Sequence, residues 1–393
     1  MTLVTVGLVL VGLPLVLLIA SYLGYPLVLL LLNRGKPAVA FTDPPEWPEL
    51  TISIPVYNEH LSIADTLDNV LSSDYPVDRR HILVISDAST DGTDAIVQRY
   101  ADRGVKLVRL PIRSGKTAAE NEAGHHLVGD LVINMDATIR VPPEAVKELV
   151  RAFTDPTVGV ASGRDVSVGD EAKESNQDES SYVGYEMWVR RLESQSGSIV
   201  GASGCFYGIR RHLFDRIFPA ALSRDFASPL IAREAGFRSV SVDRAICLVP
   251  RTRSIQAEYR RKVRTMTRGL ETLWFKRGLL NPFRHGQFAI FLGFHKLLRW
   301  MVFPSLLLAA AGLVMLAIAA PAGILALLLV VLGGLIGAIG YYWPPPGRPP
   351  RLFALAGFAV SVHLAGIEAW FRAIRGELNP IWEPTRRPHG SGR

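Results

Sequence analysis

Polar side chains that could bind a nucleotide occur in two short segments. Residues 55–59 read Pro55, Val56, Tyr57, Asn58, Glu59, and residues 86–93 form an acidic turn that contains Asp87. A carboxylate such as Asp87 can accept a hydrogen bond from the N–H group of a base. The same residue types are ordinary in turns and helix caps, so each segment alone favours a structural role. Their occurrence after two successive predicted strands favours a nucleotide site instead.

A third segment, residues 113–117, could bind phosphate. It contains Gly115 and Lys116 just before a predicted helix. A Walker A loop would need glycine where Leu110 stands, so the sequence excludes a P-loop nucleotidase. Lys116 at a helix start can still serve a diphosphate through its charge and the free amides of the first turn. Taken alone, the segment fits a solvated capping loop equally well.

A fourth segment, residues 134–139, follows an apolar run and contains Asp136. A carboxylate at a strand end can hold Mg²⁺ or Mn²⁺ together with phosphate oxygens of a substrate. One aspartate at a strand end is also a common structural feature. In isolation this segment therefore leaves the structural interpretation ahead.

An α/β domain must position these four segments. Short apolar runs predict strands at residues 51–56, 81–86, 105–110, 131–135, 158–162 and 239–242. Amphipathic stretches between them predict helices at residues 62–71, 91–103, 117–127 and 143–153. Such alternation predicts a mostly parallel sheet covered on both faces, with ligands at the carboxyl ends of its strands.

The start of the chain predicts a membrane anchor. Residues 3–33 carry no charge and are long enough to cross ~30 Å of hydrocarbon. A cleavable signal peptide would be shorter and would begin with a basic residue. Arg34 and Lys36 follow at once, which by the positive-inside tendency places the next domain in the cytoplasm.

The region after Pro250 also predicts contact with a membrane. Residues 258–277 mix basic and apolar side chains, as in a helix that lies in the interface. Residues 301–343 are charge-free and long enough for two spans that turn near Pro321. A third span at residues 352–367 is interrupted by His363, and it would place the arginine-rich tail outside, against the positive-inside tendency. Two or three spans are therefore expected.

The charge distribution and the cysteine content limit the classes of molecule that the protein is expected to bind. The formal net charge of +7 is concentrated in residues 251–284 and after residue 372, which favours anionic headgroups or phosphates. No nucleic-acid motif accompanies the charge, so no nucleic-acid partner is expected. The only two cysteines, Cys205 and Cys247, lack metal-ligand spacing and are interpreted as reduced thiols.

In their order, the four segments resemble the family 2 glycosyltransferases, which have the GT-A fold. Members of that family have Tyr-Asn-Glu after the first strand, an aspartate-rich turn, a Gly-Lys loop and an Asp-X-Asp metal motif. The resemblance continues through residues 201–211, similar to the family's glycine-containing acceptor segment, and residues 223–226, similar to its Glu-Asp motif. It covers roughly residues 50–269.

The resemblance implies a role for each matching residue. The donor, a UDP- or GDP-sugar, would be bound by Pro55, Tyr57, Glu59, Asp87, Lys116, Asp136, Arg264 and Arg268. Asp136 would also hold the Mg²⁺ or Mn²⁺ cofactor. The acceptor, a lipid-linked or membrane-proximal glycan, would contact Ser203, Gly204, Cys205 and Arg224. Asp225 would be the catalytic base of an inverting displacement, in which it deprotonates the acceptor hydroxyl.

Two departures from the family pattern qualify this assignment. Thr138 stands where a second metal-motif aspartate is usual, so metal affinity is expected to be weak. Processive members have a Gln-X-X-Arg-Trp motif on the interface helix, whereas residues 262–266 read Lys-Val-Arg-Thr-Met. Single or limited transfer is therefore favoured over the alternative of a processive polysaccharide synthase. A second alternative is an inactive membrane scaffold with the same fold.

The predicted architecture is thus a GT-A domain plus α-helical transmembrane segments. Its divisions are an anchor at residues 1–36, the transferase domain at 49–250, interface helices at 251–286, a C-terminal transmembrane region at 287–374 and a basic tail at 375–393. Membrane lipids are expected partners, and the sequence names no protein partner. The expected location is the plasma membrane of a bacterium, with the transferase domain in the cytoplasm.

Overall fold

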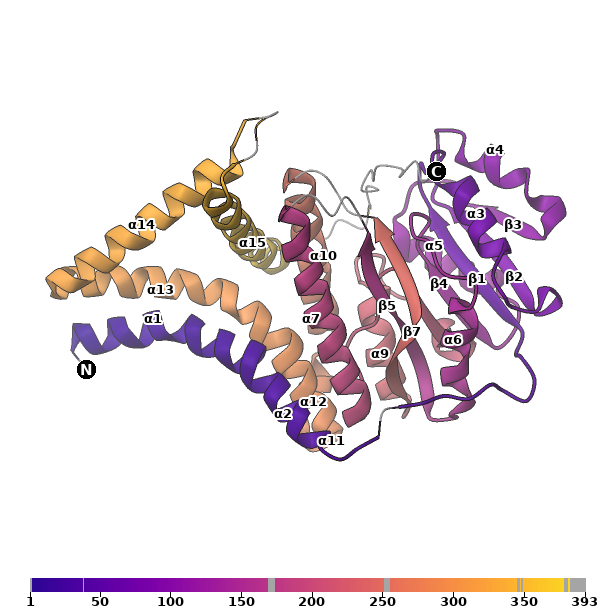
Figure 1. Ribbon diagram of the computed structural model, residues 1–393, viewed down its shortest axis with the longest axis horizontal. Coiled ribbons are helices and arrows are strands. Elements are labelled where there is room, and N and C mark those ends of the chain that lie inside the picture. Colours follow the sequence, from indigo (N-terminus) through magenta and orange to yellow (C-terminus); the bar gives the residue numbers. More distant parts are fainter. Residues whose placement is uncertain are drawn as a thin grey trace.

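The protein consists of a seven-stranded sheet flanked by helices and, beside it, a group of long apolar helices (Figure 1). The computed structural model describes residues 2–37, 39–168, 174–250, 255–344, 347, 349–377 and 381. The basic tail predicted at residues 375–393 lies almost wholly outside these residues. The predicted division into an anchor, a transferase domain, interface helices and a transmembrane region stays a prediction.

The sheet is mostly parallel, as predicted, but it contains one antiparallel strand. Its strand order is β3-β2-β1-β4-β6-β5-β7. The parallel strands on one side are β1 Leu50–Val56, β2 Arg80–Ser86, β3 Val105–Arg109 and β4 Leu131–Met135. On the other side β6 Phe206–Arg210 runs antiparallel to β4 and to β5 Val158–Val168, and β7 Arg238–Pro250 pairs in parallel with β5.

Strand β6 is the element that the sequence pattern missed. It has only five residues, and Gly208 interrupts its apolar side chains. Gly208 is needed because a Cβ there would lie 3.0 Å from both Ile133 and Phe153. The insertion of β6 between β4 and β5 makes the sheet mixed, and it also brings the residues that precede β6 next to the end of β4.

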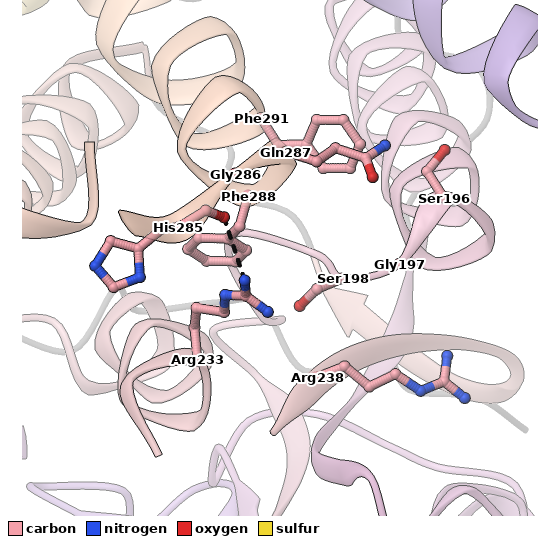
Figure 2. A pocket seen from close by; sticks show the side chains of 10 residues that line it. All are labelled: Ser196, Gly197, Ser198, Arg233, Arg238, His285, Gly286, Gln287, Phe288 and Phe291. Atoms are coloured by element: carbon pink, nitrogen blue, oxygen red, sulfur yellow. Dashed lines mark hydrogen bonds between the residues drawn. The ribbon is translucent and has the colours of Figure 1, made fainter. Parts of the chain in front are cut away.

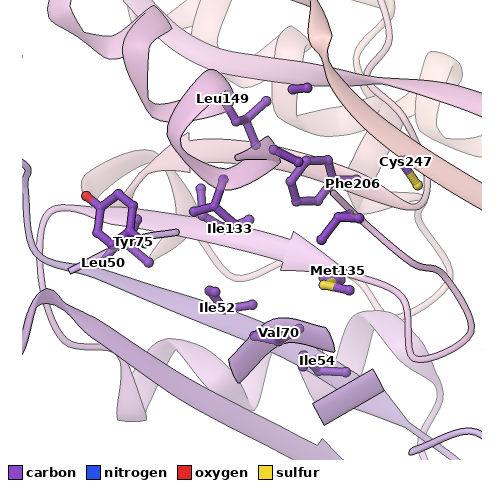
Figure 3. Close-up of a cluster of buried hydrophobic side chains, with 14 of the residues drawn as sticks. Leu50, Ile52, Ile54, Val70, Tyr75, Ile133, Met135, Leu149, Phe206 and Cys247 are labelled. Carbon is purple, nitrogen blue, oxygen red and sulfur yellow. The ribbon is translucent and has the colours of Figure 1, made fainter. Parts of the chain in front are cut away.

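Helices cover both faces of the sheet. On one face α3 Ile63–Leu71, α4 Thr93–Gln98 and α6 Ala145–Arg151 pack against the apolar side chains of β1 and β4, in the cluster drawn in Figure 3. On the other face lie α5 Lys116–Ala123, α8 Arg211–Phe214 and α9 Arg224–Glu234. The α3, α4, α5 and α6 helices occupy the predicted helical stretches but are shorter. The two differently packed faces fix the register of the strands, because a shift by one residue would move every side chain to the opposite face.

Four helical stretches are long and apolar enough to cross a membrane: Leu3–Leu32, Gln287–Ala319, Pro321–Tyr341 and Arg351–Ile374. The first comprises α1 Leu3–Ile19, a π-helical turn at Ala20–Gly24 and α2 Tyr25–Leu32. The second comprises α12 Gln287–Leu292, a π-helical turn at Gly293–Leu298 and α13 Arg299–Ala319. The last two are α14 Pro321–Tyr341 and α15 Arg351–Ile374. A break at Ala320 separates α13 from α14, at the turn predicted near Pro321.

Two long helices lie between the sheet and the apolar helices (Figure 1). They are α7 Glu174–Ser196 and α10 Ile255–Phe275. Helix α10 packs against α15, and α7 packs against both α2 and the strands β5 and β7. A short helix, α11 Pro282–His285, leads from this layer into α12.

Buried charges fasten α7 to the apolar helices. The carboxylate of Glu193 accepts hydrogen bonds from Tyr25 Oη at 2.6 Å and contacts Nδ1 of His295 at 2.6 Å. Glu186, two turns earlier, contacts Nε2 of His295 at 2.9 Å and forms an ion pair with Arg299. We call these five residues the anchor cluster. Every carboxylate in it has a cationic or hydroxyl partner, so it joins three separate segments without leaving a charge unpaired.

Candidate active site

The predicted site segments converge at one edge of the sheet. Tyr57 follows β1, Asp87 follows β2 and Asp136 follows β4, so all three lie at the carboxyl ends of parallel strands. Because β6 runs antiparallel to β4, its start lies beside the end of β4. The N–H of Asp136 accordingly donates to the carbonyl of Cys205 at 2.9 Å. Residues 201–211, which resemble the family's acceptor segment and are called the acceptor-like segment below, therefore reach the same edge of the sheet as the predicted donor-binding residues.

Asp87 is a buried carboxylate that holds the Gly-Lys loop. Only 2% of the residue is exposed. Its two oxygens accept hydrogen bonds from the backbone N–H groups of Ser114 at 2.6 Å and Gly115 at 2.8 Å. Gly115 has a φ of 94°, which a residue with a side chain rarely adopts. Asp87 thereby fixes the loop that presents Lys116 at the start of α5.

Tyr57 and Arg113 form a flat surface at the ends of β1 and β3. The guanidinium carbon of Arg113 lies 3.9 Å from the centre of the Tyr57 ring. The Tyr57 loop is also held to the loop after β2, because Asn58 Oδ1 accepts from Thr90 N at 2.8 Å. A planar base can stack on such a surface.

Two other predicted donor residues do not face outward. Pro55 is buried within β1, paired with Ile85 of β2. Glu59 is 8% exposed, and its carboxylate accepts a hydrogen bond from Ser62 Oγ at 2.7 Å. Both positions therefore support the loop that carries Tyr57.

Lys116 and Asp136 form an ion pair in the centre of the site. Lys116 Nζ lies 2.7 Å from Asp136 Oδ1 and donates to the carbonyl of Gly204 at 3.1 Å. Burial alone would lower the pKa of Lys116, but the carboxylates of Asp136, Glu120 and Asp225 more than offset this and raise it. The ammonium therefore stays charged and can meet an anionic ligand. About a fifth of each side chain in the pair is exposed, at 21% and 23%.

Asp225 lies in the first turn of α9, facing the acceptor-like segment. Ser223 Oγ donates to its Oδ1 at 2.6 Å. Its other oxygen, Oδ2, lies 3.2 Å from the position that a Cβ on Gly204 would occupy. The backbone at residue 204 thus passes directly beside the carboxylate, and a glycine there keeps that approach open.

A second carboxylate, Glu120, lies behind Lys116 and was not singled out in the sequence. It is 2% exposed, and burial raises its pKa although Lys116, Arg224 and Arg268 oppose that effect. Glu120 follows Lys116 by four residues on α5, so both occupy one helix face. The sequence contained one signal for a buried carboxylate here, because Glu120 lies on the same helix face as the apolar residues Ala119 and Ala123.

Arg268 reaches the site from α10. Its guanidinium donates to Thr117 Oγ1 at 2.6 Å and to the carbonyl of Leu222 at 2.5 Å. Burial lowers its pKa, while Asp225 and Glu120 act in the opposite direction. Arg264, one turn earlier on α10, is half-buried. The interface helix thus supplies a cation to the charged cluster around Asp225.

Arg224 does not take the position expected of an acceptor ligand. It is 3% exposed, its guanidinium carbon lies 3.9 Å from the centre of the Phe214 ring, and it donates to the carbonyls of Phe214 at 2.9 Å and Arg216 at 2.8 Å. The side chain therefore supports the loop that follows α8. The position of Arg224 next to Asp225 in the sequence does not bring its side chain to the same site, because neighbouring residues on a helix face different sides.

Ser203 is fully buried and organises the acceptor-like segment. Its hydroxyl donates to Asp165 Oδ1 at 2.5 Å and accepts from the N–H groups of Cys205 and Phe206 at 3.1 Å. Burial raises the pKa of Asp165, a carboxylate of β5. Cys205 is half-buried and packs against the core. Ser203 and Cys205 thus shape the segment, whereas Gly204 is the member closest to Asp225 Oδ2.

The described residues contain no group of three or more His, Cys, Asp or Glu side chains that could hold a metal ion. Asp136 offers a hard oxygen ligand at the strand end, with Oδ1 already paired to Lys116. Mg²⁺ and Mn²⁺ are commonly held by one or two carboxylates together with substrate phosphate oxygens and water. Asp136 therefore fits a divalent ion that arrives with a diphosphate.

A separate cavity of about 310 Å³ lies between the sheet and α12 (Figure 2). It is lined by Ser196, Gly197, Ser198, Arg233, Arg238, His285, Gly286, Gln287, Phe288 and Phe291. Arg238 begins β7, so the cavity is at the opposite edge of the sheet from Asp136. Arg233 donates across it to the carbonyl of His285 at 3.2 Å. It is no part of the charged cluster around Asp225.

Comparison with known proteins identifies the domain. Residues 51–218 match the family "Glycosyl transferase family 2". An N-acetylglucosaminyltransferase of Rhizobium sp. (strain N33) is 27% identical over 222 residues, which are 51% of this chain and 48% of that protein. An undecaprenyl-phosphate 4-deoxy-4-formamido-L-arabinose transferase of Sodalis glossinidius is 24% identical, covering 51% of this chain and 60% of that protein. The chain spans about half the length of such curated relatives.

A solved structure extends the likeness to the fold of almost the whole chain. It is a mannosyltransferase from Pyrobaculum calidifontis in complex with GDP-Man and Mn²⁺, with a TM-score of 0.71 and 24% identity, and the match covers 96% of this chain and 100% of that one. The predicted α/β fold with apolar helices is therefore confirmed. Residues 51–218 therefore carry a glycosyltransferase family 2 domain, and the chain has the GT-A fold.

Proposed function

We propose that this protein transfers one or a few sugars, with inversion, from a nucleotide-sugar to a lipid-linked acceptor at the cytoplasmic face of a membrane. The observation that carries the proposal is that Asp225 and the pair formed by Lys116 and Asp136 all approach Gly204. A base and a phosphate-binding cation would thus meet at the backbone of Gly204. The relatives are named as transferases of sugars, one of them acting on undecaprenyl phosphate.

The donor would lie along the carboxyl ends of β1, β2 and β4. Its base would stack on the surface formed by Tyr57 and Arg113, and Asp87 would accept from the base N–H while holding its loop. Its diphosphate would meet the ammonium of Lys116. Asp136 would hold Mg²⁺ or Mn²⁺ together with the diphosphate, and the ion would offset the charge that grows on the leaving group.

Asp225 would act as the general base. Its carboxylate takes the proton from the acceptor hydroxyl as the hydroxyl oxygen bonds to the anomeric carbon. The bond from that carbon to the diphosphate oxygen breaks on the opposite side, so the configuration inverts. Lys116 stabilises the negative charge of the departing nucleoside diphosphate, and Arg268 keeps the site electropositive near Asp225.

Limited transfer is favoured over processive synthesis by the composition of α10. Residues 262–266 lack the tryptophan that stacks on the growing chain in processive relatives. Lys262 instead packs over the ring of Phe358 on α15, with Nζ 4.3 Å from its centre. This part of α10 is occupied by contacts with an apolar helix.

The membrane setting is proposed from the four apolar helical stretches and the basic residues that follow the first of them. Arg34 lies just beyond the end of α2 and so marks the cytoplasmic side by the positive-inside tendency. The transferase domain would then face soluble nucleotide-sugars.

The test is turnover of UDP- and GDP-sugars by the purified protein in lipid, with Mn²⁺ or Mg²⁺ and an extract of polyprenyl-linked glycans as acceptor. We expect product whose new linkage has the inverted anomeric configuration by NMR, in lengths of one to a few sugars. The Asp225→Asn variant should lower turnover by about 10²- to 10⁴-fold. Long polymers would favour the processive alternative, and folded wild-type protein without turnover of any donor would favour the inactive scaffold.

A further inference from the structure

Two cations beside the acceptor-like segment have no carboxylate partner within ion-pair distance among the described residues. Arg190 lies on α7 and Lys296 in the π-helical turn between α12 and α13. Arg190 Nε and Nη1 are buried, and neither makes a hydrogen bond. Elsewhere on the same surface of α7, Glu186 and Glu193 are fully engaged in the anchor cluster. A buried guanidinium without partners is costly unless something anionic joins it.

Lys296 lies directly against the backbone of the acceptor-like segment. A Cβ built on Gly201 would be 3.4 Å from Lys296 Cε and 3.6 Å from its Nζ. The ammonium of Lys296 is also 5.8 Å from the centre of the Phe226 ring. Phe226 is the residue that follows Asp225 in the sequence. Lys296 and the catalytic base therefore flank the same short segment, one at Gly201 and the other at Gly204.

Arg190 on α7 acts on the same segment through Asp165. It is the strongest cationic influence on Asp165, whose carboxylate accepts the hydroxyl hydrogen of Ser203. Glu186 is the strongest charged influence on Lys296, followed by Arg190, Arg299 and Glu193. Lys296 thus lies against Gly201, and Arg190 lies within electrostatic range of both Lys296 and Asp165, the partner of Ser203.

The spacing indicates what kind of anion fits. Three residues of extended chain, from Gly201 to Gly204, span at most about 10 Å. An anion held by Lys296 would therefore lie within a few sugar rings of Asp225 but not in contact with it. A bare lipid phosphate would place its own ionised oxygen at the reacting carbon and would need no base. A base and a separate cationic site instead fit an acceptor whose phosphate and reacting hydroxyl are different groups.

We propose that Arg190 and Lys296 form a phosphate subsite that binds the diphosphate of a glycosylated lipid diphosphate, while a hydroxyl of its terminal sugar faces Asp225. This rests on the proposed glycosyl transfer and specifies its acceptor. The lipid chain would leave the subsite along α12 and α13, which carry Lys296 and are apolar enough to lie in a membrane. A phosphodiester headgroup of a membrane phospholipid offers similar chemistry, so the test must separate the two.

The test is binding of farnesyl diphosphate to the full chain in neutral detergent, with nucleoside diphosphate and Mn²⁺ added to fill the donor site. We expect Arg190→Gln and Lys296→Gln each to weaken binding about tenfold or more. Arg191→Gln is the matched control, because Arg191 is 53% exposed and pairs with Asp243 at 3.7 Å on another side of α7. It should bind as the wild type does. Farnesol, which lacks the charge, should bind equally to all variants.

Three outcomes decide the proposal. Equal affinity of the wild type and both Gln variants for farnesyl diphosphate would overturn it. Competition by phosphatidylglycerol at the same concentration as farnesyl diphosphate would assign the subsite to a phospholipid headgroup and would also overturn it. Retained binding in Arg190→Lys and Lys296→Arg, with loss in the Gln variants, would support it and exclude misfolding as the cause. Because binding needs no turnover, its result is independent of whether the proposed transfer is observed.

Discussion

The anchor cluster and the active-site cluster both bury charge, but they pair it differently. In the anchor cluster His295 contacts two carboxylates, and each carboxylate has a further partner, either Tyr25 or Arg299. Around Asp225 the pairing is incomplete, since Glu120 is buried with a raised pKa and one Asp225 oxygen lies beside the backbone of Gly204. Complete pairing indicates a structural joint, and incomplete pairing indicates a site that a ligand completes.

The largest effect should come from breaking the anchor cluster. Replacing Glu193 with Ala leaves His295 and Tyr25 without their shared carboxylate in a fully buried position. We expect the free energy of unfolding to fall by about 3–5 kcal/mol, measured by thermal or denaturant unfolding in detergent. The control is Glu234→Ala, which removes a surface pair with Lys276 and should cost about 0–1 kcal/mol. Equal losses in the two variants would contradict the comparison.

Removing the central cation should affect catalysis rather than folding. Lys116→Ala leaves Asp136 partly exposed to water and takes away the charge that we propose faces the diphosphate. We expect turnover to fall by about 10²- to 10³-fold with little change in unfolding temperature. Lys106→Ala, at an exposed position of β3, is the matched control and should leave both quantities unchanged. A large fall in stability in Lys116→Ala would mean that this pair is structural as well.

A smaller effect is expected from crowding Asp225, the proposed catalytic base. In Gly204→Ala the new methyl carbon would lie 3.2 Å from Asp225 Oδ2, a tight contact that displaces either group by a fraction of an ångström. We expect turnover to fall about tenfold because catalysis is sensitive to such displacements. Gly124→Ala has open space around the added carbon and should behave as the wild type does. Unchanged turnover in Gly204→Ala would argue that Asp225 is not the base.

The smallest effect should be a difference in acid sensitivity between the clusters. Burial would raise the pKa values of Glu186 and Glu193, but His295 and other partners more than offset it and lower both below 4.5. A lowered folded-state pKa gives stability that is present above about pH 4.5 and is lost as the pH falls further. Glu120 has a raised pKa and contributes in the opposite direction.

The measurement is the unfolding temperature between pH 7 and pH 4. Wild-type protein should lose stability as the pH falls below about 4.5, and Glu193→Gln should lose less because one of the two carboxylates is gone. A steeper acid loss in Glu193→Gln than in the wild type would show that other groups control acid unfolding.

Most of the secondary structure could be predicted because its signals are local. The strand at residues 131–135 and the break near Pro321 follow from apolar runs and helix-breaking residues within a short window. The ordered motifs likewise indicated which strand ends would meet, since parallel strands align their carboxyl ends. Strand β6 was missed because its pairing partners, β4 and β5, are distant in sequence and its own five residues carry little periodicity.

By itself, the sequence determined the family, the strand ends that form the site and the apolar helical stretches. Only the tertiary structure decided which charges pair. In the folded chain Arg224 donates to the loop after α8, and Glu120 lies close enough to Lys116 to raise its pKa. Lys296, almost a hundred residues later in the sequence, lies against Gly201. The physical reason is that a charged side chain acts over a few ångströms of space, whatever its separation along the chain. Local patterns fix the elements, and long-range packing fixes the electrostatic partners on which function depends.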